Sequence, residues 1–238
     1  MSQFAALYRM ILGTIATKGR LALLGALGVV AVVIAFAMSN ADTLGDPVQD
    51  AADLVNGYGL SVLVPVVALV FASAALGDLV DDSTLVYLWL RPVPREILAL
   101  AATAAAATIA IPLVAVPLAL SAALAGGDGG LVVGTVTAAA VCGLAYCGLF
   151  VALGLRIKRA LSWGIAYVLI WEGFVARAGS GAARVSIQTY GRSILQQASD
   201  VQLNLADVAP VPAVVVPVLV AMIGVAFTTR FLHSRDVA

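Results

Sequence analysis

The chain consists of long apolar runs separated by short polar segments. A bilayer core of about 30 Å requires roughly 20 helical residues at about 1.5 Å each, and six runs approach or exceed that length. The third and fourth runs are long enough to tilt, and the fifth is short unless it begins in the preceding polar turn. The pattern predicts an all-α polytopic membrane protein with six transmembrane helices, at residues 21–38, 58–77, 97–124, 131–155, 161–175 and 211–231.

A different pattern precedes the first predicted span. Within residues 1–20, apolar side chains recur at helical spacing beside polar ones, which predicts an amphipathic helix lying along the inner leaflet. An extension of the first span into the cytoplasm is the alternative. The apolar positions are Phe4, Leu7, Tyr8, Ile11 and Ile15, and the polar ones are Gln3, Arg9 and Lys18.

Basic residues predict the orientation, because cytoplasmic segments of membrane proteins carry an excess of Lys and Arg. With the N-terminus inside, the external segments hold only Arg177, Arg184 and Arg192. Both termini are therefore expected in the cytoplasm, in the cell inner (cytoplasmic) membrane. The predicted cytoplasmic residues are Arg9, Lys18, Arg20, Arg91, Arg95, Arg156, Lys158, Arg159, Arg230 and Arg235.

Composition narrows the functional classes. Of the 238 residues, 62% are hydrophobic and 11% are charged, and the net charge is zero, so no nucleic-acid partner is expected. Neither Lys18 nor Lys158 is followed by Ser or Thr, so the sequence has no phosphate-binding loop for ATP. Residues 1–238 form a single predicted transmembrane domain, with a cytoplasmic segment at 78–96 and an external segment at 176–210.

The segment 78–96 interrupts the apolar pattern. Three carboxylates, Asp78, Asp81 and Asp82, follow the second span. Each costs roughly 2.5–3.5 kcal/mol at the centre of a bilayer, so the chain must leave the membrane there. Asp82 or Ser83 is expected to cap a short cytoplasmic helix that ends before Pro92.

The apolar face of this short helix consists of Leu85, Leu88 and Trp89. Two turns of helix are too few to be stable alone, so the face must dock on something. It lies either flat on the membrane surface or in a groove of a cytoplasmic partner protein, with Arg91 and Arg95 as polar contacts at the rim. The physical chemistry of the segment leaves both destinations open.

The order of these features resembles the permease subunits of ABC-2 type ATP-binding cassette transporters. The resemblance is carried by Asp78, by Ser83-Thr84-Leu85, by Leu88-Trp89-Leu90 and by Pro92-Val93-Pro94-Arg95. It extends to the six spans, although the family more often has Glu at the position of Asp78 and fewer aromatic residues in this turn. The resemblance implies a coupling helix that contacts an ATPase through Asp78, Asp81, Asp82, Ser83, Thr84, Leu85, Leu88, Trp89, Arg91 and Arg95.

The same resemblance implies partners and a direction of transport. A separate ATPase subunit, in two copies, would bind ATP and Mg, and this chain would carry no cofactor and no enzymatic activity of its own. A second permease copy, as a homodimer, would complete the path, and transport would be export. Because the spans hold few polar side chains, a lipid, drug or natural product is the expected substrate. The alternative function is a non-transporting membrane enzyme or an assembly scaffold.

One carboxylate, Glu172, falls in the outer part of the fifth span, where an acid requires a partner, water or a proton. One interpretation is an external gate in which Glu172 pairs with Arg177, Arg184 or Arg192, and Tyr190 belongs to the same gate. The alternative is a structural anchor where the helix breaks. By resemblance to the ABC-2 family, residues 186–197 would form a short external re-entrant helix.

Overall fold

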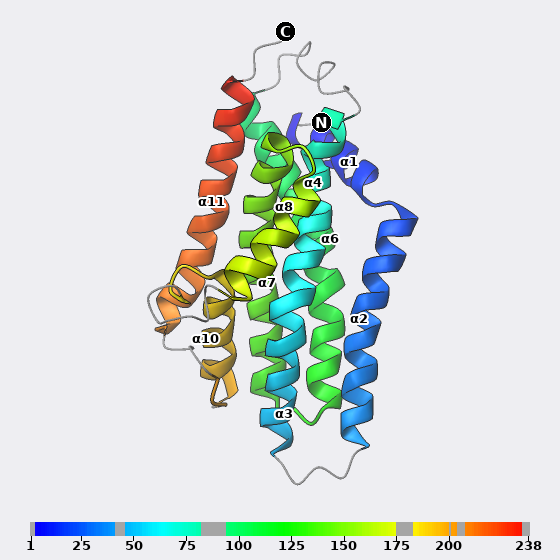
Figure 1. The fold of residues 1–238 in the computed structure, drawn as a ribbon, viewed down its shortest axis with the longest axis vertical. Helices are drawn as coiled ribbons and strands as arrows, with labels where there is room; N and C mark the ends of the chain where they lie inside the picture. The colour runs from blue at the N-terminus through cyan, green and yellow to red at the C-terminus, as the bar shows by residue number, and fades with distance from the viewer. Residues whose placement is uncertain are drawn as a thin grey trace.

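The structure is a computed structural model, which describes residues 3–40, 46–81, 94–174, 183–199, 201–203 and 208–234. All regular secondary structure in these residues is helical. The helices run mostly side by side along the long axis (Figure 1). They are α1 (Gln3–Ile15), α2 (Lys18–Ser39), α3 (Pro47–Leu54), η1 (Val55–Leu63), α4 (Val64–Asp81), α6 (Arg95–Leu124), α7 (Gly129–Arg156), α8 (Ala160–Ala166), η2 (Tyr167–Glu172), α10 (Ile187–Ser199) and α11 (Pro210–Ser234).

Among the described residues, 5 helices are long and apolar enough to cross a membrane: α2, the continuous helix Pro47–Val80, α6, α7 and α11. The all-helical membrane class is therefore confirmed. The predicted fifth span, residues 161–175, begins as a shorter apolar helix, Ala160–Glu172. Its crossing of the membrane stays a prediction.

The helix Pro47–Val80 changes its hydrogen-bonding register in the middle. Its segment η1 is π-helical, and the N–H of Val64 bonds to the carbonyl of Gly59, five residues earlier. Pro65 follows directly; it has no N–H, and its ring would clash with the carbonyl four residues back in a regular α-helix. The wider π turn relieves that conflict, so the helix continues through Pro65 as one element.

Helix α7 lies at the centre and packs against α4, α6, α10 and α11. Glycine makes two of these contacts close: a Cβ on Gly154 would collide with the backbone of Ser73 in α4, and one on Gly148 would lie 2.7 Å from the Cα atom of Ala221 in α11. The outer helices are less enclosed, since 22% of the apolar window of α2 is buried, against 78% for Pro47–Val80. The described part of the bundle therefore has a tight centre and a looser periphery.

The N-terminal helix α1 is separate from the first span. Leu7, Ile11 and Ile15 are buried, as the predicted apolar stripe requires, and α1 packs against α6 and α4. Helix α1 ends at Ile15, and Thr17 caps α2 by accepting a hydrogen bond from the N–H of Arg20. The amphipathic helix is thus present, and its position along a leaflet stays a prediction.

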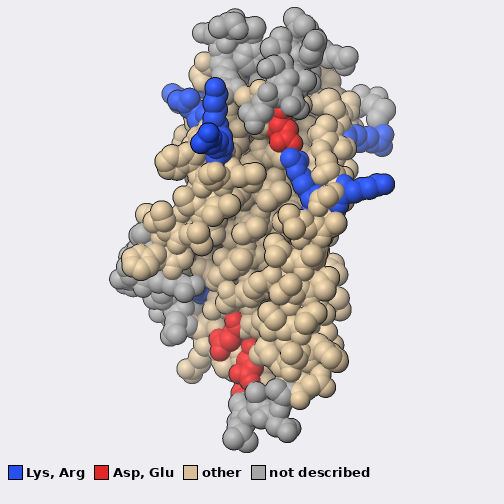
Figure 2. Space-filling model, turned by 45° about the vertical axis from the view of Figure 1, so that its right-hand side comes forward, with Lys and Arg blue, Asp and Glu red and all other residues tan. Residues whose placement is uncertain are grey.

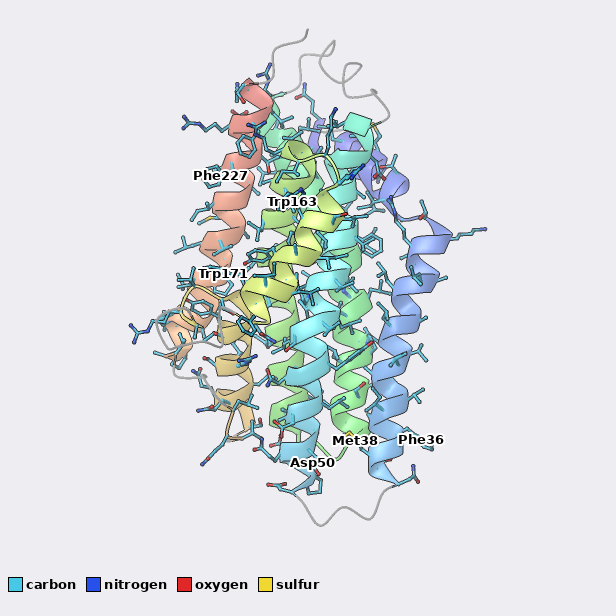
Figure 3. All side chains as sticks on the ribbon, in the orientation of Figure 1. Phe36, Met38, Asp50, Trp163, Trp171 and Phe227 are labelled. Atoms are coloured by element: carbon cyan, nitrogen blue, oxygen red, sulfur yellow. The ribbon has the colours of Figure 1, made fainter. Side chains whose placement is uncertain are left out.

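Charged side chains gather near the two ends of the bundle. We call the end at which α1 lies and α11 finishes the terminal end, and the opposite end, at α3, the far end (Figure 1). Figure 2 shows basic side chains near the terminal end of one face and carboxylates at the far end. Exposed apolar side chains include Phe36 of α2, toward the far end, and Phe227 of α11, toward the terminal end (Figure 3). This is the charge distribution of a protein whose middle lies in lipid.

Candidate functional site

Buried polar side chains concentrate where α10 enters the bundle near the far end. Helix α10 is polar, yet its residues from Ile187 to Leu195 are all buried, and it packs against α7, α11 and η1. Buried polar groups require hydrogen-bond partners, and here they come from two π-helical segments. We call this cluster the polar junction; it comprises Asn56 and Ser61 of η1, Tyr167 and Glu172 of η2, and Ser186, Gln188 and Arg192 at or in α10.

Glu172 forms the η2 side of the polar junction. Its side chain is 2% exposed, and its carboxylate accepts hydrogen bonds from the backbone N–H groups of Ile187, at 3.1 Å, and Gln188, at 3.5 Å. The hydroxyls of Ser186 and Tyr167 donate to the same carboxylate, the latter at 3.2 Å. Glu172 therefore caps the N-terminus of α10 from another helix, where the helix dipole also favours a negative charge.

The other side of the polar junction lies on η1. The Nε–H of Arg192 donates to Oδ1 of Asn56 at 2.8 Å, and the side-chain amide of Gln188 donates to the hydroxyl of Ser61. Helix α10 is thus attached both to η1, in the helix Pro47–Val80, and to η2, in the helix Ala160–Glu172. Both attachments use π-helical segments. The wider π turn changes the face of the helix on which the following side chains lie, and such segments often occur at functional sites.

The contacts of the polar junction can hold the start of α10 in place. Within the described ranges, no group of three or more His, Cys, Asp or Glu side chains is placed to hold a metal ion. The carboxylate of Glu172 accepts hydrogen bonds from four donors, and these contacts position α10. A displacement of η1 or η2 would therefore move the start of α10.

A second polar contact lies at the terminal end. Nη2 of Arg20, near the start of α2, lies 2.9 Å from Oδ2 of Asp78, near the end of α4. Both side chains are partly exposed, at 31% and 42%. Asp78 is thus paired three residues before the end of α4, where the predicted coupling segment continues the chain.

The other predicted coupling residues are placed only in part. Asp81 is the last residue of α4, and Arg95 is the first residue of α6, so the two flank the predicted coupling helix at the terminal end. The remaining predicted coupling residues lie outside the described residues: Asp82, Ser83, Thr84, Leu85, Leu88, Trp89 and Arg91. Their role stays a prediction.

The predicted gate residues are partly brought together. Tyr190 lies in α10, the helix that Glu172 caps, and its hydroxyl donates to the backbone carbonyl of Arg184 at 2.6 Å. Arg192 hydrogen-bonds to Asn56, and Arg177 lies outside the described residues. Glu172 thus has the anchoring contacts that the alternative interpretation requires, and its role in a gate stays a prediction.

The partners that complete both sites could not be predicted from the sequence. Asn56 and Ser61 are polar residues at the start of a long apolar run, and Ser186 precedes a helix as an N-cap residue does. These signals were present, but nothing in the sequence indicated which residue each would contact. Arg20 indicated the orientation of the chain in the membrane, but nothing in the sequence indicated that it contacts Asp78.

Comparison with known proteins adds one result. A family model described as ABC-2 family transporter protein matches residues 16–179, which is more than half of the chain. No curated protein gives a significant match. The matched region contains the paired residues Arg20 and Asp78 as well as Glu172. The chain therefore belongs to the ABC-2 family of transporter proteins.

Proposed function

We propose that this chain is the permease subunit of an ATP-binding cassette exporter, driven by a separate ATPase subunit that binds ATP and Mg. Its substrate is an apolar or amphipathic molecule such as a lipid, a drug or a natural product, because the described spans contain few polar side chains. Two copies of the chain, as a homodimer, line the path, and two ATPase subunits drive it.

In this proposal the protein lies in the inner membrane of the cell, and its terminal end faces the cytoplasm. The support is the positive-inside rule, applied to the basic residues that the bundle carries at this end. Ala160–Glu172 belongs to the fifth of six spans, and α10 roofs the path on the external side. The helix ends and connections at the terminal end hold the described basic residues Arg9, Lys18, Arg20, Arg95, Arg156, Lys158, Arg159 and Arg230.

One observation carries the proposed coupling: Pro47–Val80 is a single continuous helix. At 34 residues and about 1.5 Å per residue it is about 50 Å long. Its terminal end holds Asp78, next to the predicted coupling segment, and its π-helical part holds Asn56 and Ser61 of the polar junction. A push by the ATPase on residues 78–96 would therefore reach α10 through one helix.

The test is a double substitution in the predicted coupling helix, Leu88→Ala with Trp89→Ala, in the complex of permease and ATPase reconstituted into vesicles. We expect ATP hydrolysis to lose its dependence on substrate and transport to be lost, while membrane insertion is unchanged. The matched control is Leu219→Ala with Phe227→Ala, which removes an apolar and an aromatic side chain from the exposed face of α11.

Unchanged coupling in the Leu88/Trp89 variant would contradict the proposal. Metal-dependent turnover by the isolated chain, without an ATPase, would support the alternative of a membrane enzyme. The proposal would be supported directly if the wild-type chain co-purified with an ATPase subunit and the double substitution abolished this co-purification.

A further inference from the structure

A cavity of about 160 Å³ opens at the terminal end between α4, the start of α2 and the connection from α7 to α8. Since a cavity needs roughly 10–15 Å³ to hold one water, this space is large enough for a polar group of several atoms. Its walls include apolar residues of α4 and three basic residues, Arg20, Lys158 and Arg159, with Asp78 as the acidic one.

Among the described residues that line this cavity, basic side chains outnumber carboxylates. Asp78 is engaged by Nη2 of Arg20, which leaves Lys158 and Arg159 without a carboxylate among the lining residues. Nη1 of Arg20 is itself buried and has no hydrogen-bond partner within the described part of the chain. Lys158 and Arg159 border the cavity and are exposed. Guanidinium and ammonium groups bind phosphate oxygens through charge-assisted hydrogen bonds.

We propose that this cavity binds a phosphate group, and that its source is the headgroup of an anionic phospholipid. The position favours a lipid over a free ion, because the wall of the cavity continues into the exposed apolar side chains of α8. Leu161 lines the cavity and is 47% exposed, and Ile165, one turn further along the same face of α8, is also 47% exposed. A headgroup in the cavity would therefore leave its acyl chains beside an apolar helix.

The test measures lipid binding by the purified chain with native mass spectrometry, after exchange into micelles containing phosphatidylglycerol or phosphatidylcholine. We expect the wild-type chain to retain phosphatidylglycerol preferentially. Lys158→Gln with Arg159→Asn should weaken this binding roughly thirtyfold, at about a fivefold loss for each basic residue near a membrane surface. Asn suits position 159 because Arg159 has φ 62°, a left-handed conformation in which Asn is enriched.

Two further variants separate loss of charge from loss of structure. Lys158→Arg with Arg159→Lys keeps both charges and should retain the lipid, whereas Lys18→Gln removes a basic residue that does not line the cavity and should change nothing. Equal binding of the two lipids by the wild-type chain, or an unchanged preference in the Gln/Asn variant, would overturn the site. Displacement of the lipid by inorganic phosphate at equal concentration would keep the phosphate site and overturn the lipid as its source.

Discussion

The polar junction at the far end and the Arg20–Asp78 pair at the terminal end both join helices through charge, but they differ in burial and in the number of donors. Glu172 is 2% exposed and accepts four hydrogen bonds, two of them from backbone N–H groups. Asp78 is 42% exposed and meets Arg20 through one described contact. One is an enclosed network, and the other is a pair open to solvent.

This difference determines how each contact responds to force and to mutation. Removing a buried acceptor lowers the free energy of unfolding. Each of its donors is then left without a partner in a place that water does not reach. A partly exposed pair exchanges its partner for water and ions at little cost. The terminal end therefore has an attachment that opens easily, near the predicted site of the ATPase, and the far end has one that resists opening.

The largest expected effect comes from Glu172→Ala. It leaves the N–H groups of Ile187 and Gln188 without their acceptor, so the free energy of unfolding should fall by about 3–5 kcal/mol. Thermal unfolding in detergent measures the change, and limited proteolysis reports whether α10 is released. The control Glu172→Gln keeps an acceptor oxygen and should cost less; an Ala variant as stable as the wild type would remove the distinction between the two ends.

A smaller effect is expected on the η1 side of the polar junction. Asn56→Leu removes the acceptor for the Nε–H of Arg192 and should lower the free energy of unfolding by about 2 kcal/mol. Asn56→Asp retains an acceptor at the same place and should recover most of the loss. If Leu and Asp behaved alike in thermal unfolding, this hydrogen bond would not contribute to the attachment of α10.

The Arg20–Asp78 pair should contribute less still. A double-mutant cycle of Arg20→Gln and Asp78→Asn is expected to give a coupling energy of about 0.2–1 kcal/mol, because both side chains are partly solvated. The value should decrease as salt is raised. A coupling energy as large as the loss in Glu172→Ala would mean that the terminal end is as firmly closed as the far end.

The smallest effect is expected at His233, whose Nε2 lies 3.5 Å from Oε1 of Glu96 with both side chains more than half exposed. His233→Ala should leave the unfolding temperature where the surface control Lys18→Gln leaves it. A clear decrease would show that exposure is a poor guide to the strength of charged contacts in this protein.

The apolar pattern predicted two of the long helices closely, because a bilayer requires long uninterrupted runs, whereas the predicted span 58–77 is only part of the longer helix Pro47–Val80. The runs 131–155 and 97–124 appear as α7 and α6 with ends shifted by at most two residues. The polar contacts depended on tertiary packing instead: Arg20 and Asp78 are 58 positions apart, and Gln188 and Ser61 are 127 apart. The position of Glu172 within an apolar run predicted that it needs a partner. No local sequence pattern indicates that this partner is the N-terminus of another helix.

The glycines of α7 have a consequence for how sequences of this kind diverge. At Gly148 and Gly154 the neighbouring backbones occupy the space of a side chain, so no larger residue fits without separating the helices. Evolutionary change is therefore expected mainly on the outer surfaces of α2 and α11, where side chains are exposed. Homologous chains should keep small residues along the central helix while their outer surfaces drift with the membranes they inhabit.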